Sequence, residues 1–579
     1  MDRIKVFQII IFIVFLIIIL RLFYWQFFSS YSRDSDAFLR ESEIPASRGE
    51  IYTNDGFPLV ANAEAFLIYG KPHELDKKPE DIAKTLAPLL ISEKYATISA
   101  ELSEDQLKQK EEEIKQKERD LLAKLNNKNL YWVQLARKVP LETKEKIQKL
   151  VVRGLGFERD EKRFYPEASM AAQLLGFVGF DKFGRDIGYN GLEGYWDNRL
   201  HGKSGRLGQE QDPFGLPILV GKYKPIPSKQ GASLYLSIDR TIQFIVEDKL
   251  RKAVEKYGAK DGTVIVADPK SGHILAMATF PNFNPALRSE YDEKLYRNPA
   301  VSDTFEPGSI FKLIAMSAAL DLSIVEPNTK CSCSGPRNIG GYEISTWNKK
   351  YHPDSTMTEI IQNSDNVGMT YVAEKLGVDK FYDYIAKFGF GKLTGIDLQS
   401  ESTGNIRNKK EWHSIDLATA SFGQGIAVTP IQMVQAVSVI ANKGELLGPR
   451  LVVEVKDQEH EELVESQERR QVINPKTAVQ ITEMMVNSVE KGEARFFAPV
   501  GYRIAGKTGT AQIPVAGHYD PNKTVASFIG FAPADNPQFV MFVRFSQPSS
   551  SPYGSETAAP TFFEIAKELF NYLGVAPTK

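Results

Sequence analysis

Cysteine and net charge are both scarce in this 579-residue chain. Its two cysteines, Cys331 and Cys333, rule out a disulfide framework, and the single residue between them places them poorly for bridging each other. We expect them to be small buried side chains without a redox or metal role. The formal net charge of −2 argues against a nucleic-acid partner, because proteins that bind nucleic acid usually carry a strong basic excess.

Histidine is also sparse, with seven residues scattered along the chain and none at the spacing of metal ligands. We therefore expect no metal ion and no other cofactor. Hydrophobic residues make up 42% of the chain and charged residues 25%, which is typical of folded globular domains and excludes a mostly disordered protein. A chain of this length is too long for one hydrophobic core, so two or three domains are expected.

Long apolar runs are absent except at the N-terminus. Residues 6–28 are almost wholly apolar and are long enough to cross a bilayer as one helix. Arg3 and Lys5 precede this run, and positive charge before a span predicts a cytoplasmic N-terminus. A cleavable signal peptide is the alternative, but its apolar core would be shorter and followed by small residues, whereas Leu-Phe-Tyr-Trp stands at 22–25.

These features predict three regions. Residues 1–28 form a cytoplasmic tip and a single-pass anchor in the cell (inner) membrane, and everything that follows is extracytoplasmic or periplasmic. Residues 29–228 supply apolar material for a mixed domain. Residues 229–579 form a larger α+β domain, in which strands at both ends (262–279 and 503–545) enclose a mostly helical region. One antiparallel sheet flanked by helices, with a helical subdomain, fits this order.

Ser309 opens an apolar helix in this larger domain, after a Pro-Gly break at 307–308. Lys312 lies about one helical turn further on, on the same face and among apolar neighbours. Burial disfavours the charged ammonium, so a neutral Lys312 could take the proton of the Ser309 hydroxyl. Taken alone, however, the same spacing suits a helix-capping serine and a lysine that extends its ammonium to solvent.

Two further motifs follow in order and favour catalysis. Ser364-Asp365-Asn366 precedes an apolar helix, and Lys507-Thr508-Gly509-Thr510 lies in a predicted strand. Two similar tripeptides, Lys-Ser-Gly at 203–205 and at 270–272, both precede Ser309, and we dismiss them. The ordered set of three motifs is characteristic of penicillin-binding proteins and β-lactamases.

Acyl transfer by such a set requires a nucleophile, a base, a proton relay and an oxyanion hole. We assign Ser309 as the nucleophile and Lys312 as its base. Ser364 passes a proton towards the leaving amine, and Asn366 holds Lys312 and the substrate amide. Asp365 is interpreted only as a local hydrogen-bond acceptor.

The third motif is expected to bind the substrate. Lys507 contributes positive charge, while the hydroxyls of Thr508 and Thr510, flanking Gly509, are offered to a substrate carboxylate. The backbone N–H groups of Ser309 and Thr510 would form the oxyanion hole.

The chain resembles class B penicillin-binding proteins, the monofunctional D,D-transpeptidases of peptidoglycan synthesis, over almost its whole length. Besides the three motifs, the resemblance is carried by Arg48-Gly49-Glu50-Ile51 with Asp55-Gly56, Arg163-Phe164-Tyr165-Pro166, Leu175-Gly176-Phe177-Val178-Gly179 and Gly191-Leu192-Glu193. It implies that residues 29–228 are a pedestal (dimerisation-type) domain and 229–579 a transpeptidase domain. Peptidoglycan stem peptides and β-lactams are the implied ligands.

Within that family the septal, FtsI-like branch fits best, through motifs such as Phe422-Gly423-Gln424-Gly425 and Gly506 to Gln512. This implies a role in cell division with divisome proteins and a SEDS-type glycosyltransferase as membrane partners. An elongation-type transpeptidase is the nearest alternative. A D,D-carboxypeptidase or β-lactamase on the same scaffold, and a non-enzymatic scaffold or β-lactam sensor, are the others.

Overall fold

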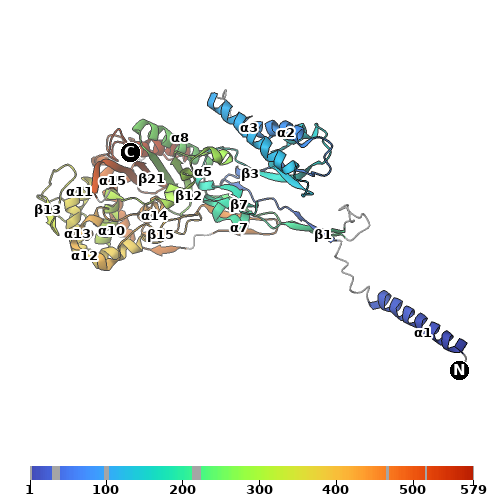
Figure 1. Ribbon diagram of the computed structural model, residues 1–579. Coiled ribbons are helices and arrows are strands. Elements are labelled where there is room, and N and C mark those ends of the chain that lie inside the picture. The colour runs from blue at the N-terminus through green and yellow to red at the C-terminus, as the bar shows by residue number, and fades with distance from the viewer. Residues whose placement is uncertain are drawn as a thin grey trace. The chain divides into compact units, whose positions relative to one another are not determined.

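The computed structural model describes residues 3–28, 39–96, 104–210, 223–464, 468–515 and 518–577 (Figure 1). The chain forms two compact units. One comprises Met1–Ser47 and Gly202–Gln230, and the other comprises Arg48–His201 and Gly231–Lys579.

The first unit contains the N-terminal helix and a small sheet. Helix α1 spans Arg3–Phe23 and continues as one π-helical turn over Tyr24–Phe28. Within the described residues it provides the one helix, Lys5–Gln26, that is long and apolar enough to cross a membrane. The sheet has the order β1-β8-β9, formed by Leu39–Ile44, Gly205–Glu210 and Tyr223–Ile226.

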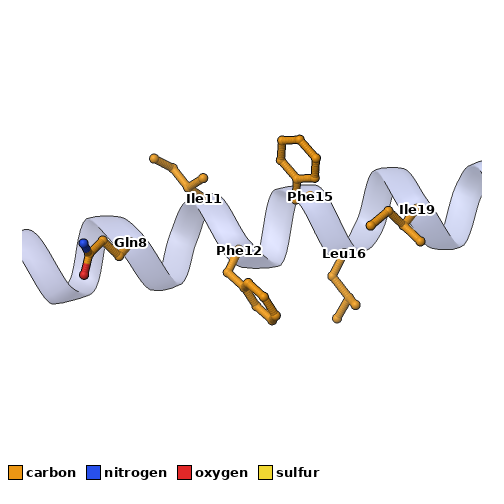
Figure 2. A pocket seen from close by; sticks show the side chains of 6 residues that line it. All are labelled: Gln8, Ile11, Phe12, Phe15, Leu16 and Ile19. Atoms are coloured by element: carbon orange, nitrogen blue, oxygen red, sulfur yellow. The ribbon is translucent and has the colours of Figure 1, made fainter.

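The α1 side chains stand outward from a single helix. A hollow on its surface is lined by Gln8, Ile11, Phe12, Phe15, Leu16 and Ile19 (Figure 2). Five of these six side chains are apolar, and all are exposed. Such a surface offers no catalytic group, and it has the character of a face that contacts lipid.

The second unit is built on two sheets. The first has seven strands in the order β17-β16-β10-β2-β3-β4, with β5 also paired to β3. Its strands come from distant parts of the chain: Ile51–Tyr52 (β2), Pro58–Gly70 (β3), Val133–Pro140 (β4), Leu155–Phe164 (β5), Ser233–Leu236 (β10), Val452–Lys456 (β16) and Glu461–Leu463 (β17). Helices α2 (Pro79–Ala96), α3 (Glu104–Leu125) and α4 (Leu141–Gln148) share a small apolar core with β3 and β4.

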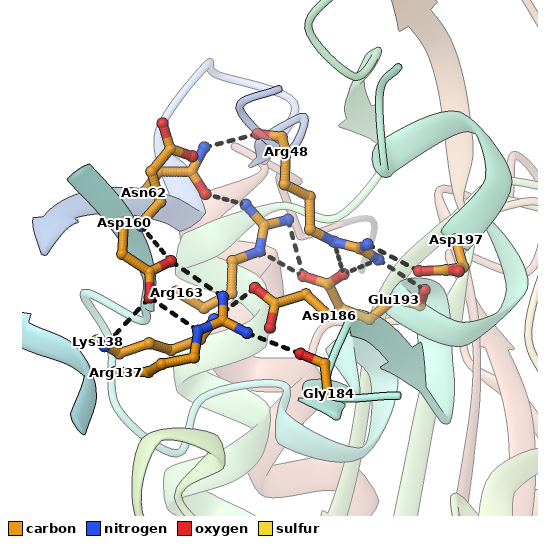
Figure 3. A network of polar contacts seen from close by, with 11 residues as sticks. Arg48, Asn62, Arg137, Lys138, Asp160, Arg163, Gly184, Asp186, Glu193 and Asp197 are labelled. Atoms are coloured by element: carbon orange, nitrogen blue, oxygen red, sulfur yellow. Dashed lines mark hydrogen bonds and ion pairs between the residues drawn. The ribbon is translucent and has the colours of Figure 1, made fainter. Parts of the chain in front are cut away.

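Short elements continue this part of the unit: α5 (Ala172–Leu175), β6 (Phe177–Phe180), β7 (Asp186–Tyr189), α6 (Gly191–Tyr195) and α7 (Asp197–Leu200). Glu193 of α6 is completely buried and lies between two guanidinium groups (Figure 3). Its carboxylate oxygens lie 2.6 Å from Arg48 Nη2 and 2.8 Å from Arg163 Nη2. Arg48 also pairs with Asp197 at 2.7 Å. This buried network ties the start of the unit to β5 and α6.

The second sheet has five antiparallel strands in the order β12-β11-β21-β20-β19. They span Asp261–Ala267 (β11), Ile274–Phe280 (β12), Ala505–Val515 (β19), His518–Ala532 (β20) and Phe539–Ser546 (β21). Alternate residues face opposite cores: Val264 and Val266 join one apolar cluster, and Ile265 joins another. Helices α8 (Arg240–Tyr257) and α16 (Ala558–Tyr572) cover the face of the sheet that carries Val264 and Val266. The sequence-based expectation of an antiparallel sheet flanked by helices is confirmed.

The other face is covered by the helical region. Helix α10 (Lys312–Asp321) is buried on all sides, as its apolar sequence requires. Helices α12 (Asn366–Lys387), α13 (Ser414–Ser421) and α15 (Pro475–Lys491) pack against it. The same region holds α9 (Pro299–Ser302), α11 (Met357–Gln362) and α14 (Pro430–Ala441). Short pieces of 3-10 helix lie at Pro285–Glu290, Glu293–Tyr296, Gly308–Phe311 and Lys409–Glu411. The region also holds the hairpin β13–β14 (Arg337–Ile339, Tyr342–Ile344) and the antiparallel pair β15 and β18 (Glu445–Leu447, Arg469–Gln471).

The expectation that the two cysteines would not bridge each other is wrong. Cys331 and Cys333 form a disulfide, because the backbone bends between them and brings their Cα atoms to 5.5 Å, within the range that a disulfide spans. Both side chains are buried, as expected. A disulfide is compatible with an extracytoplasmic location.

Replacing Glu193, the buried carboxylate at the centre of the ion network, tests how much the network contributes to stability. We expect Glu193→Gln to lower the free energy of unfolding by about 3–5 kcal/mol, because the buried Arg163 would lose its counter-charge and the buried Arg48 would keep only Asp197. Chemical denaturation of the purified protein measures the change. The control Glu158→Gln removes an exposed carboxylate on β5 and should stay within about 0.5 kcal/mol of wild type. Equal stability of the two variants would contradict a structural role for this network.

Candidate active site

Ser309 lies in a short 3-10 turn, Gly308–Phe311, that leads directly into α10. The cap position of this turn is Pro307, which makes no side-chain capping bond, so the alternative interpretation of Ser309 as a helix cap is wrong. The Ser309 side chain is half-buried. It is therefore held by the backbone of the turn at the mouth of the helix, while its hydroxyl stays accessible.

Glycines let two other segments approach the Ser309 turn closely. Gly423 accepts a hydrogen bond from the N–H of Gly308 at 3.0 Å, and a Cβ on Gly423 would lie 2.1 Å from the Gly308 carbonyl oxygen. On β19, a Cβ on Gly509 would lie 2.4 Å from Ser527 Oγ and 3.0 Å from Ile310 Cγ2. Side chains at these positions would push the strand and the loop away from the Ser309 turn.

Lys312 is the first residue of α10 and is completely buried. A lysine that extends its ammonium to solvent is therefore excluded. Its Nζ lies 2.6 Å from the Ser364 carbonyl oxygen, 2.8 Å from Asn366 Oδ1 and 3.3 Å from Ser364 Oγ. Burial, followed by the nearby positive charge of Lys507, holds the pKa of Lys312 well below its ordinary value.

Ser364 sits between α11 and α12 in the left-handed region, with φ of +55°. Non-glycine residues rarely adopt this conformation, and it recurs at functional sites where the surroundings hold it. Asp365 supplies that support, because its Oδ1 accepts the Gly368 N–H at 3.1 Å and caps α12. The interpretation of Asp365 as a local acceptor agrees with this contact. The Asn366 side chain also donates from Nδ2 to the Ser345 carbonyl oxygen at 3.3 Å.

Lys507 approaches the same serine from β19, the edge strand of the five-stranded sheet. Its Nζ lies 3.1 Å from Ser364 Oγ and 3.2 Å from Thr508 Oγ1. Burial lowers the pKa of Lys507 to about 8, while the carboxylate of Glu493 opposes this shift. The hydroxyl of Ser364 thus lies between the amines of two buried lysines.

The two threonines of the third motif contact different segments. Thr508 Oγ1 donates to Glu493 Oε2 at 3.3 Å, and Thr510 Oγ1 accepts the Gly554 N–H at 3.1 Å. The structure thus brings together the segments that carry the predicted site residues Ser309, Lys312, Ser364, Asn366, Lys507, Thr508, Gly509 and Thr510. Of the dismissed motifs, the one at 270–272 is the turn between β11 and β12, where Lys270 Nζ contacts Asn536 Oδ1 at 2.8 Å.

Sequence reasoning missed three further residues, of which one contacts Thr508 and two lie close in sequence to the residues that contact Asn366 and Thr510. Glu493 stands outside every motif and reaches Thr508 only through the fold. Trp347 and Tyr553 lie on segments 206 positions apart, and their ring centroids are 5.8 Å apart. No periodicity or local spacing would have paired these residues, because their contacts depend on long-range folding alone.

Comparison with known families gives two matches that cover most of the chain. Residues 43–236 match the penicillin-binding protein dimerisation domain. Residues 262–568 match the penicillin-binding protein transpeptidase domain.

Curated relatives align over nearly the full length. Stage V sporulation protein D of Bacillus subtilis is 35% identical, with 98% of this chain and 85% of the relative aligned. The probable peptidoglycan D,D-transpeptidase PbpC of Pseudomonas aeruginosa is 33% identical, over 93% of this chain and 89% of the relative. The peptidoglycan D,D-transpeptidase FtsI of Escherichia coli is 29% identical, with 93% of this chain and 86% of the relative aligned.

Solved structures share the fold. A peptidoglycan synthetase from Bifidobacterium adolescentis superposes with a TM-score of 0.73 at 28% identity, covering 93% of this chain and 98% of the other. Penicillin-binding protein 3 from Mycobacterium tuberculosis, complexed with aztreonam, superposes with a TM-score of 0.69 at 25% identity. The alignment again covers 93% of this chain and 98% of the other. With both family domains present and full-length relatives above 30% identity, this chain belongs to the class B penicillin-binding proteins, the family of peptidoglycan D,D-transpeptidases.

Proposed function

We propose that this transpeptidase works through an acyl-enzyme on Ser309 and that it also binds penicillin covalently there. The observation that carries the proposal is the position of the Ser364 hydroxyl, 3.3 Å from Lys312 Nζ and 3.1 Å from Lys507 Nζ. Three segments far apart in the sequence supply these groups. A structural role alone gives no reason to bury two lysines against one serine, because burial of each charge costs free energy.

In the first half-reaction, Lys312 acts as the base. A neutral amine has two N–H groups, which match the short contacts to the Ser364 carbonyl oxygen and Asn366 Oδ1, and its lone pair is then free to accept a proton. Ser309 Oγ gives its proton to Lys312 and bonds to the carbonyl carbon of the penultimate D-Ala. The peptide bond to the terminal D-Ala breaks, and the proton passes by way of Ser364 to the departing amine.

The second half-reaction transfers the acyl group. The amine of a neighbouring stem peptide attacks the carbonyl carbon of the Ser309 ester and loses a proton to the same relay. The new amide bond forms as the ester C–O bond breaks, and the relay returns the proton to Ser309 Oγ. Lys507 and the hydroxyl of Thr510 bind the donor carboxylate before acylation. The Thr508 hydroxyl, expected from the sequence to bind it too, donates its hydrogen to Glu493 and accepts one from Lys507. The N–H groups of Ser309 and Thr510 stabilise the oxyanion, and the edge position of β19 favours this role because outward-facing N–H groups of an edge strand are unpaired within the sheet.

We further propose that α1 anchors the protein in the cell (inner) membrane with the N-terminus cytoplasmic and the catalytic domain outside. The positive charges before the helix support this orientation. Residues 29–228 then serve as the pedestal and 229–579 as the transpeptidase domain. A SEDS-type glycosyltransferase and divisome proteins would be its membrane partners, because the chain supplies cross-linking and the glycan strands must come from another enzyme.

A septal role in cell division is the cellular function that we propose, supported by the full-length similarity to FtsI. The relative named Stage V sporulation protein D favours a second candidate, wall synthesis during sporulation. Depletion of the protein in growing cells separates these roles. Filamentous cells with failed septa and fewer cross-linked muropeptides are expected for the septal role. Rounded cells would favour an elongation role, and normal growth with defective spores would favour sporulation.

Replacing the proposed nucleophile tests the chemistry. We expect a fluorescent penicillin to label the wild-type protein and to leave Ser309→Ala unlabelled, because the alanine has no hydroxyl to acylate. Denaturing gel fluorescence and intact mass measure the adduct. Ser317→Ala is the matched control: Ser317 lies buried on the same helix, α10, and should be dispensable for labelling.

Two outcomes would contradict this account. Labelling of Ser309→Ala at the wild-type level would exclude Ser309 as the nucleophile. Rapid turnover of the penicillin, with loss of the adduct within seconds, would instead favour a hydrolytic β-lactamase or carboxypeptidase on the same scaffold.

The two lysines predict a bell-shaped pH dependence of penicillin acylation. As pH falls below the lowered pKa of Lys312, the base becomes protonated and the rate declines. As pH rises through about 8, Lys507 loses the charge that attracts the carboxylate, and the rate declines again. In Lys507→Arg the alkaline decline should disappear up to pH about 10, because a guanidinium keeps its charge. The acylation rate constant measured from pH 5 to 10 tests this, and an unchanged alkaline decline in Lys507→Arg would contradict it.

A further inference from the structure

Glu493 lies at a sharp turn beside the site, outside all the motifs. It follows α15 and Gly492, where the backbone is too crowded for a side chain: a Cβ on Gly492 would lie 2.2 Å from the Ser488 carbonyl oxygen and 3.0 Å from that of Gln362. The helix therefore ends abruptly, and the next residue turns towards β19. The Glu493 side chain is half-buried, and its Oε2 accepts the hydrogen bond from Thr508 Oγ1 at 3.3 Å.

A chain of hydrogen bonds connects this carboxylate to the catalytic lysines. Lys507 Nζ donates to Thr508 Oγ1 at 3.2 Å, and the same hydroxyl donates its own hydrogen to Glu493. Lys507 Nζ also reaches Ser364 Oγ at 3.1 Å, and Ser364 lies against Lys312. One hydroxyl therefore separates Glu493 from the Lys507 ammonium, and its orientation is fixed from both sides.

The charges around the two lysines indicate what the Glu493 carboxylate does. The charged groups that face them are Asp365, before α12, and Glu493, after α15. Asp365 raises the pKa of Lys312, and its carboxylate is engaged in capping α12. Glu493 is the charge that opposes the effect of burial on Lys507 and raises its pKa. Glu493 also raises the pKa of Lys312, but it is linked by hydrogen bonds to Lys507, through the Thr508 hydroxyl.

We infer that Glu493 is a positioning residue of the transpeptidase site, which acts through the Thr508 hydroxyl to keep the Lys507 amine charged and aimed at the donor carboxylate. The inference rests on the proposed acyl transfer by Ser309. It adds a fourth segment, the turn after α15, to the three that carry the motifs. Without the Glu493 carboxylate, Lys507 loses its charge at a lower pH, and Thr508 loses the acceptor that orients its hydroxyl.

The test is the pH profile of acylation by a fluorescent penicillin in the full-length, detergent-solubilised protein. Glu493→Gln keeps the shape of the side chain and removes its charge. We expect its alkaline decline to move by about one pH unit to lower pH, so that the rate at pH 8.5 falls about tenfold while the rate at pH 6.5 changes less than about threefold. Glu493→Asp should restore most of the wild-type profile, because it retains the charge.

Glu490→Gln is the matched control, since it removes an exposed carboxylate from the last turn of α15. We expect its profile to match wild type. An unshifted alkaline decline in Glu493→Gln, an equal loss of rate at every pH, or an equal shift in Glu490→Gln would overturn the inference. If wild type fails to acylate, or Ser309→Ala acylates normally, it is the proposed function that fails, so the two failures are distinguishable.

Discussion

Two lysine amines meet at one serine hydroxyl inside this protein, and the rest of the site depends on that contact. Lys312 and Lys507 are both completely buried, and both lie within hydrogen-bond distance of Ser364 Oγ. Two positive charges would repel each other strongly in such surroundings. The cluster is stable when one amine is neutral, and neutrality is the property that a general base requires. The arrangement that lowers the electrostatic cost is therefore also the one that favours catalysis.

The fold maintains this contact by close backbone approach. Gly509 and Gly423 allow β19 and a loop to pack directly against the Ser309 turn, because neither position has room for a Cβ. Ser364 is held in a left-handed conformation by the capping bond of Asp365. These positions are set by backbone geometry, so Ser309, Ser364 and the two lysines are arranged before any substrate binds.

Much of the site was predictable from the sequence because the motifs carry it locally. The spacing of Ser309 and Lys312 and the order of the later motifs indicated which segments meet. The strand patterns of residues 262–279 and 503–545 indicated one antiparallel sheet flanked by helices. Contacts between distant segments were not predictable: the parallel pairing of β10 with β2, the bend that joins Cys331 to Cys333, and the reach of Glu493 to Thr508. Each depends on how remote segments pack.

The central claim is that Lys312 gives up its proton more readily than Lys507, because burial and the charge of Lys507 hold the pKa of Lys312 well below its ordinary value. A direct measurement is an NMR titration of the full-length protein carrying 13C,15N-lysine, with the two signals assigned by Lys312→Arg and Lys507→Arg. The account predicts that the Lys312 signal titrates at a lower pH than the Lys507 signal, which should change near pH 8. A Lys312 amine that stays protonated above pH 10, or that titrates after Lys507, would contradict it.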